Sequence, residues 1–200
     1  MLPKLQYISQ GATAPQQLEH IRKVLDLGCK WIQLRFKQQE QIVLVSLAET
    51  VKQLCAAYDA MLIINDHVNI AKEVAADGVH LGLSDTPVAV ARQTLEAGKI
   101  IGGTANTLDD VRQRIREGCD YIGLGPYRFT ATKEKLSPVL GLEGYRQLFA
   151  SLSATERTVP IYAIGGILKE DIPALLDAGL YGIAVSGLLT HTVEPIDCII

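Results

Sequence analysis

The chain has 200 residues, a formal net charge of −3 at pH 7 and 48% hydrophobic residues. A chain of this length can bury a substantial core, so we expect residues 1–200 to form a single domain. The slightly acidic balance gives no reason to expect nucleic acid or an anionic membrane as a partner. The sequence has no apolar run of the ~18 residues that a membrane span needs, and its N-terminus lacks signal-peptide features. These features predict a cytoplasmic protein.

The four cysteines, Cys29, Cys55, Cys119 and Cys198, stand far apart and form no C-x-x-C pair. This spacing is not that of a zinc site or a disulfide framework, and it predicts buried free thiols.

Short apolar runs alternate with longer amphipathic stretches along the whole chain. The apolar runs are bounded by Gly, Asp or Pro, as buried parallel strands tend to be, and we predict that they form strands. They are residues 5–9, 31–35, 61–65, 79–81, 100–103, 121–125, 161–164 and 182–185. Helix-like patterns lie between them. Gly28, Gly118 and Gly179 stand just ahead of three of the runs, where helix C-caps are expected.

An internal repeat supports closure of these strands into a barrel. Residues 28–34 recur as residues 118–124, and more loosely as residues 76–81 and 179–185. Alternating strands and helices imply a parallel sheet, and eight similar strands predict an α/β fold of the parallel (β/α)₈ TIM-barrel type. An open, flavodoxin-like sheet is the alternative.

The connection formed by residues 126–140 contains no convincing helix or strand pattern. Loops of this length are usually functional in compact domains. This one follows the sixth predicted strand, on the face where barrels carry their active sites. We therefore predict a mobile lid.

Charged and polar residues stand where the predicted strands end, and those ends converge on one mouth. Strand alternation puts Gln33, Arg35 and Lys37 on one side of the second strand. Asp66 and Asp85 follow the third and fourth strands. Arg and Lys can bind phosphoryl oxygens, and two Asp can hold a hard cation such as Mg²⁺. The alternative is that these charged residues are solvent-exposed loop residues without a binding role.

Glycines after the last two strands indicate a second anion site. Gly165 and Gly166 open the predicted helix after the seventh strand, and Ser186 and Gly187 open the last segment after the eighth. Glycine lets backbone N–H groups approach an anion, and a phosphate site at this place is common in the fold.

The histidines do not assemble into catalytic motifs. His80 lies inside a predicted strand and is interpreted as a hydrogen-bonded core residue. The sequence yields no Ser-His-Asp or Cys-His arrangement, no H-E-x-x-H and no Walker motif.

Six ordered motifs together resemble those of thiamine-phosphate synthases. They are residues 33–37 (QLRFK), 64–66 (IND), 77–85 (DGVHLGLSD), 121–126 (YIGLGP), 130–133 (TATK) with 141–144 (GLEG), and 163–167 (AIGGI). The resemblance implies a transferase that joins hydroxymethylpyrimidine diphosphate to hydroxyethylthiazole phosphate, giving thiamine phosphate and pyrophosphate. It also implies that pyrophosphate leaves before the thiazole nitrogen attacks, in a dissociative mechanism.

The resemblance assigns roles position by position. Gln33, Arg35, Lys37, Asn65 and Lys133 would hold the pyrimidine diphosphate, with Arg35, Lys37 and Lys133 as the catalytic cations. Thr104 would stand near the pyrimidine, and Asp66 and Asp85 would bind Mg²⁺. Thr130, Thr132, Gly166, Ser186 and Gly187 would hold the thiazole phosphate. The expected partners are these small phosphorylated molecules, with homo-oligomerisation left open.

Some positions depart from the family pattern. Leu83 replaces a usual polar residue, Thr104 a usual Ser and Asn106 a common His, and the last helix is expected to be short or absent. Two alternatives stay open. Thiazole tautomerase relatives share the barrel but carry a catalytic His where this chain has Pro126. A non-catalytic phosphate-binding regulatory barrel would be expected to lack the metal and pyrophosphate residues that stand here.

Overall fold

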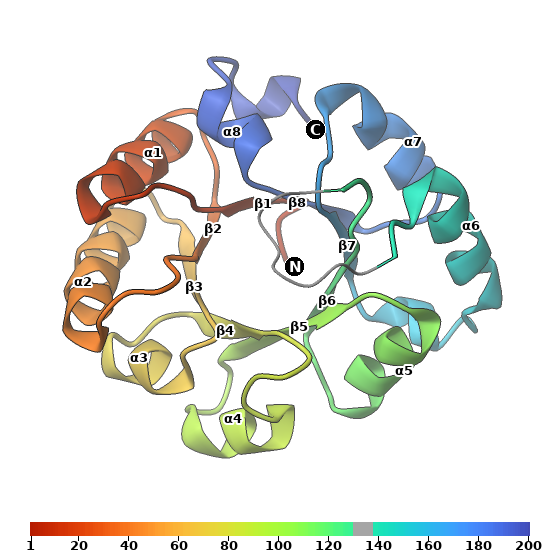
Figure 1. Cartoon of the computed structure of the whole chain (residues 1–200), viewed down its shortest axis with the longest axis horizontal. Helices are drawn as coiled ribbons and strands as arrows, with labels where there is room; N and C mark the ends of the chain where they lie inside the picture. Colours follow the sequence, from red (N-terminus) through yellow and green to blue (C-terminus); the bar gives the residue numbers. More distant parts are fainter. Residues whose placement is uncertain (130–137) are drawn as a thin grey trace.

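The computed structural model describes residues 1–129 and 138–200, and its strands close into one barrel (Figure 1). The strands are β1 (Leu5–Ile8), β2 (Trp31–Leu34), β3 (Met61–Asn65), β4 (Gly78–Leu81), β5 (Ile100–Ala105), β6 (Tyr121–Leu124), β7 (Ile161–Ile164) and β8 (Gly182–Val185). They are parallel and follow the chain order, and β1 pairs with both β2 and β8. The predicted (β/α)₈ barrel is confirmed. The flavodoxin-like alternative is wrong, because an open sheet would leave two edge strands unpaired.

Helices surround the barrel (Figure 1). They are α1 (Ala14–Asp26), α2 (Gln41–Ala57), α3 (Val68–Glu73), α4 (Val88–Thr94), α5 (Leu108–Arg116), α6 (Gly141–Ser151), α7 (Ile172–Asp177) and α8 (Gly187–His191). The 3₁₀ turns are η1 (Glu156–Thr158), η2 (Lys169–Asp171) and η3 (Ile196–Cys198). The last helix is short, as expected, with five residues. Within residues 1–129 and 138–200, none of the helices has the length and apolar character of a membrane span.

The strands are buried on both faces because they separate two apolar regions. Ile32 and Leu34 of β2 belong to the larger region between sheet and helices, whereas Trp31 points into the barrel. Inside, Trp31, Tyr121 and Tyr162 pack edge to face, with ring centroids 4.9–5.7 Å apart. Such pairs add to the free energy of simple burial. These aromatic rings come from the first two residues of their strands and fill the amino-terminal half of the barrel. The carboxyl-terminal half is left for polar side chains.

Three predicted glycine caps are confirmed. Gly28, Gly118 and Gly179 follow α1, α5 and α7 with φ of +100°, +78° and +101°. These left-handed conformations end each helix and turn the chain toward the next strand.

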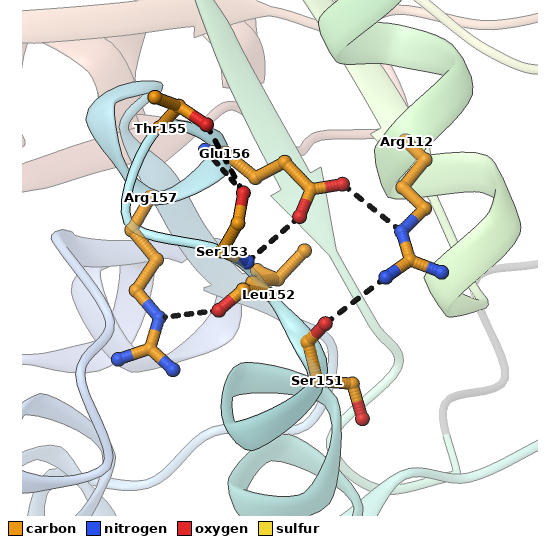
Figure 2. Close-up of polar contacts among 7 residues, drawn as sticks. All are labelled: Arg112, Ser151, Leu152, Ser153, Thr155, Glu156 and Arg157. Atoms are coloured by element: carbon orange, nitrogen blue, oxygen red, sulfur yellow. Dashed lines mark hydrogen bonds and ion pairs between the residues drawn. The ribbon is translucent and has the colours of Figure 1, made fainter.

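On the outside of the barrel, an arginine on α5 ties that helix to the segment between α6 and β7 (Figure 2). Arg112 Nε donates to Glu156 Oε1 at 3.0 Å, and its Nη2 donates to the Ser151 carbonyl at 3.0 Å. Glu156 Oε2 accepts the Ser153 amide hydrogen at 2.7 Å. This contact, together with Arg112, lowers the pKa of Glu156. None of these residues lines the cavity described below.

The four cysteines are free thiols, and Cys29, Cys55 and Cys119 are buried. Burial raises the pKa of the Cys29 thiol to about 11, so it stays protonated at neutral pH. The prediction of burial is wrong for Cys198, which lies exposed in η3 near the end of the chain.

Candidate active site

A cavity of about 430 Å³ opens at the carboxyl ends of the strands, where barrels of this kind carry their active sites. Seven predicted binding residues line it: Gln33, Arg35, Asn65, Thr104, Gly166, Ser186 and Gly187. The other lining residues are Ile8, Gln10, His80, Pro126, Ile164, Gly165, Ile167, Leu168, Ala184, Val185 and Leu188. Polar side chains therefore gather on the β2–β5 side, whereas glycines and apolar residues form the β7–β8 side.

A chain of hydrogen-bonded side chains crosses the barrel from β2 to β5. Gln33 Nε2 donates to Gln6 Oε1 at 3.0 Å, and Gln6 Nε2 donates to the Tyr121 hydroxyl at 3.3 Å. The Tyr121 hydroxyl lies 3.0 Å from His80 Nδ1, and His80 Nε2 lies 2.9 Å from Thr104 Oγ1. Because a buried polar network restrains each of its members, the orientations of Gln33 and Thr104 are coupled.

His80 is a core residue and also part of the cavity wall. The prediction of a hydrogen-bonded core histidine is confirmed, since the residue is 6% exposed and both ring nitrogens have partners. Its place in the wall was not predicted. Strand alternation was the available signal, because Leu81 packs among the helices and the preceding side chain must then point inward.

The two cations that follow β2 take different places. Arg35 lines the cavity, and its backbone is held by the Ser9 hydroxyl, which accepts the Arg35 amide hydrogen at 3.0 Å. Lys37 lies outside the lining, with Nζ 4.0 Å from Asp66 Oδ2. Of the three residues predicted to lie on one side of β2, Gln33 and Arg35 therefore line the cavity, whereas Lys37 lies at its rim.

Asp66 and Asp85 form a carboxylate pair at that rim. Burial raises the pKa of Asp66 to about 6, with further contributions from a hydrogen bond to Asp85 and from its charge. Asp66 directly follows β3 with φ of +65°, a left-handed conformation that Asp adopts more readily than most residues. Asp85 Oδ2 accepts the Gly82 amide hydrogen at 2.6 Å, which orients the second carboxylate.

The chemistry of this pair fits a magnesium ion. A cation between the two carboxylates would offset both the burial of the Asp66 charge, which is the main cause of its raised pKa, and the smaller repulsion from Asp85. In the described ranges, no group of three or more His, Cys, Asp and Glu side chains could hold a metal. Mg²⁺ does not need one, because it keeps several waters and is often bound by one or two carboxylates plus substrate phosphates.

The opposite wall is shaped by the turn after β7. Gly165 and Gly166 have φ of +89° and +68°, and a Cβ on Gly166 would lie 2.8 Å from the Cβ of Arg128. Glycine is therefore required both by conformation and by space. The prediction that this turn opens a helix is wrong, because η2 comes first and α7 begins only at Ile172. Anion binding here would depend on the turn's backbone N–H groups rather than on a helix terminus.

Ser186 follows β8, and its hydroxyl donates to Gln10 Oε1 at 3.1 Å. Gln10 follows β1 and lines the cavity, although no sequence pattern singles it out. The contact joins segments 176 positions apart in the chain, and it exists because the barrel closes between β8 and β1.

Three predicted site residues, Thr130, Thr132 and Lys133, lie outside the described residues, as does most of the predicted lid. The residues that deviate from the family pattern are described. Leu83 is 46% exposed in the turn between Gly82 and Asp85. The Asn106 side-chain amide donates to the Gly125 carbonyl, beside Pro126 in the wall.

The fold and this cavity define a (β/α)₈-barrel protein with a cavity of small-molecule size at the carboxyl ends of its strands. A family model described as thiamine monophosphate synthase matches residues 6–189. The chain is 55% identical to a thiamine-phosphate synthase of Flavobacterium psychrophilum, covering 100% of this chain and 97% of that protein. It is 53% identical to that of Flavobacterium johnsoniae, covering 97% and 92%. Among solved structures, a thiamine phosphate pyrophosphorylase from Pyrococcus furiosus matches with a TM-score of 0.82 and 32% identity, covering 98% and 94%. The chain therefore belongs to the thiamine-phosphate synthase family.

Proposed function

We propose that this transferase joins hydroxymethylpyrimidine diphosphate to hydroxyethylthiazole phosphate, forming thiamine phosphate and releasing pyrophosphate. One observation carries the proposal: two different walls, each with groups suited to an anion, face each other across one cavity. Arg35 and Asn65 line the first wall, beside the carboxylate pair, and Gly166 and Gly187 belong to the second. Two phosphorylated substrates could therefore be held at the same time, with their reacting ends between the walls.

The first wall would hold the diphosphate. Arg35 would donate to phosphoryl oxygens, and Lys37 would contribute a second positive charge at the rim. Asp66 and Asp85 would hold Mg²⁺, which when bound neutralises part of the diphosphate charge. By family resemblance, Lys133 would join these cations.

The reaction then requires charge stabilisation and orientation. The bond between the pyrimidine methylene carbon and the diphosphate oxygen breaks, and its electron pair leaves with pyrophosphate. The electron-rich pyrimidine shares the positive charge left on the methylene carbon. The lone pair of the thiazole nitrogen forms the new carbon–nitrogen bond. Arg35 and Lys37 would stabilise the departing charge, and the second wall would fix the thiazole by its phosphate.

Two features weigh against the alternatives. The cavity wall has Pro126 at the place where thiazole tautomerase relatives carry their catalytic His. A non-catalytic phosphate-binding barrel would have no use for Asp66 beside Asp85, an arrangement with an unfavourable electrostatic cost. Cytoplasmic location and homo-oligomerisation stay predictions from the sequence.

The test is an assay with purified protein, both phosphorylated substrates and Mg²⁺, with thiamine phosphate and pyrophosphate quantified separately. We expect the two products in equal amounts, and a loss of both when either substrate is omitted. Pyrophosphate formed without thiamine phosphate would indicate a hydrolase. Absence of both products would overturn the proposal.

A further inference from the structure

The turn formed by Gly165 and Gly166 is clamped from the neighbouring strand end by Arg128. The Arg128 amide hydrogen is donated to the Gly165 carbonyl at 2.9 Å, and Arg128 Nη1 donates to the Gly166 carbonyl at 3.0 Å. The Tyr127 amide hydrogen is donated to the Ile164 carbonyl at 2.8 Å. Three successive carbonyls, from residues 164 to 166, thus bind the segment that follows β6.

The Arg128 guanidinium is itself held by Asp171. Nη2 donates to Oδ1 at 2.7 Å, and Nη1 donates to Oδ2, which makes a two-pronged ion pair. The Asp171 side chain is 7% exposed, whereas that of Arg128 is 44% exposed. Paired in this way, the guanidinium lowers the pKa of Asp171 and keeps the carboxylate charged.

Asp171 also orders the segment after the turn. Its Oδ2 accepts the Leu168 amide hydrogen at 2.8 Å, and its Oδ1 accepts the Tyr127 hydroxyl at 3.3 Å. Arg128 additionally stacks over the Tyr127 ring, with 4.7 Å between its Cζ and the ring centroid. The pair therefore restrains the turn at both ends, from Gly165 to Leu168, and all four of these residues line the cavity.

The backbone amides of this turn are suited to an anion. Among the described residues, the N–H groups of Gly166 and Ile167 have no hydrogen-bond acceptor. Left-handed backbone at Gly165 and Gly166 is readily lost if nothing holds it, because glycine has the widest choice of conformations. Three of the N–H groups of the Arg128 guanidinium are donated to Asp171 and Gly166, so most of its hydrogen-bonding capacity serves to fix the turn.

We propose that Arg128 and Asp171 act together as positioning residues for the thiazole phosphate, holding the Gly165–Gly166 turn in its anion-binding form. The proposal rests on the proposed function for the identity of the ligand. It predicts an effect on one substrate, since the diphosphate wall lies across the cavity and shares none of these contacts.

The experiment compares Arg128→Gln, Asp171→Asn and the double variant with the wild-type protein, using steady-state kinetics and calorimetric titration with thiazole phosphate alone. Arg112→Gln is the matched control, because it breaks another arginine–carboxylate pair on the barrel exterior (Figure 2). We expect each single variant to raise the KM and Kd for thiazole phosphate about tenfold. The KM for the diphosphate should change less than twofold, and Arg112→Gln should change neither.

The double variant separates positioning from direct binding. If the two residues act as one clamp, it should be no worse than either single variant. A further tenfold loss in the double variant would mean that the two residues contribute independently, as they would if Arg128 contacted the ligand itself, and this overturns the proposal. Equal weakening of both substrates, or an equal effect of Arg112→Gln, would reduce the pair to general stability and also overturn it. Arg128→Lys is a second variant should Arg128→Gln not fold; it keeps the charge but not the two-pronged geometry, so it should show the same selective loss.

The two readouts also separate this inference from the proposed reaction. Turnover in the wild type with an unchanged thiazole phosphate KM in Arg128→Gln would overturn the inference and leave the reaction standing. Thiazole phosphate binding that weakens selectively in Arg128→Gln, without turnover in the wild type, would support the inference and overturn the proposed reaction. A wild type that neither binds thiazole phosphate nor turns over would overturn both.

Discussion

The Nε2 atom of His80 lies 2.9 Å from the hydroxyl oxygen of Thr104, and both residues line the cavity. His80 Nδ1 is engaged by the Tyr121 hydroxyl, so the ring is held from both sides. Thr104→Val would keep the shape but leave the His80 nitrogen facing a methyl group. The lost buried hydrogen bond should lower the free energy of unfolding by about 1–2 kcal/mol. Because the proposed role of the Thr104 hydroxyl is to stand beside the pyrimidine, kcat/KM for the pyrimidine diphosphate should fall as well.

Thr104→Ser is the matched control, because it keeps the hydroxyl and should retain most of the activity. Steady-state kinetics of both variants check the prediction. If Thr104→Val were as active as Thr104→Ser, the hydroxyl would have no role in binding the pyrimidine.

The carboxylate pair predicts a pH-dependent stability with a definite sign. The folded-state pKa of Asp66, about 6, lies above its ordinary value of 3.8. The folded protein therefore binds more protons than the unfolded chain between these values, and its stability falls as pH rises through the window. Asp66→Asn should remove this penalty. Without metal, that variant should be more stable than the wild type by about 3 kcal/mol at pH 7, with little difference near pH 4.

Chemical denaturation in EDTA at both pH values measures this difference. Asp59→Asn is a matched control, since Asp59 is exposed and also left-handed, with φ of +51°. Added Mg²⁺ should raise the wild-type Tm but not that of Asp66→Asn, and turnover of the variant should be nearly lost. An Asp66→Asn protein less stable than the wild type at pH 7 would contradict the electrostatic account.

The fold could be predicted from the sequence to a large extent, because strands buried on both faces are short continuous apolar runs. Their positions are right, but β1, β2 and β6 end one residue earlier than predicted, β4 begins at Gly78 and β5 extends to Ala105. These ends are set by pairing partners, such as Ile63 opposite Gly78, which lie outside the local pattern.

The candidate site was predictable where a residue's chemistry and its place at a strand end agree, as for Arg35, Asn65 and Thr104. The clamp formed by Arg128 and Asp171 was not, because the partners are 43 positions apart and their contact depends on how two loops meet. His80 was assigned to the core alone, because its position inside a predicted strand indicates burial, and its inward direction follows only when strand alternation is counted from Leu81.

Gly166 offers a test of the second wall. In Gly166→Ala the new Cβ would approach the Arg128 Cβ at 2.8 Å, in a backbone conformation with φ of +68°. The strain should cost about 1–2 kcal/mol of stability, and the displaced turn should raise the KM for thiazole phosphate about tenfold or more. Gly118→Ala carries similar strain, with φ of +78°, but has no neighbour within 4 Å. It should lose stability without a change in KM; a change in both KM values for Gly166→Ala would argue against a separate thiazole phosphate site.

Lys37 gives the sharpest test of the rim, because its removal should affect two ligands in opposite directions. Its Nζ lies 4.0 Å from Asp66 Oδ2, with the two side chains 56% and 27% exposed, so in the absence of substrate it competes with a cation for that carboxylate. An exposed pair at this distance is worth about 1 kcal/mol. Lys37→Gln should therefore bind Mg²⁺ alone up to about fivefold more tightly. The same variant should bind the pyrimidine diphosphate at least tenfold more weakly and show a lower kcat, because the positive charge of Lys37 no longer stabilises the departing pyrophosphate.

Lys72→Gln removes the same charge from an exposed position on α3 and controls for the change in net charge. Calorimetry with Mg²⁺ and, separately, kinetics with the diphosphate measure the two effects. Weaker binding of both ligands by Lys37→Gln would show that Lys37 orders the rim rather than competing for Asp66, and unchanged diphosphate kinetics would remove Lys37 from the site.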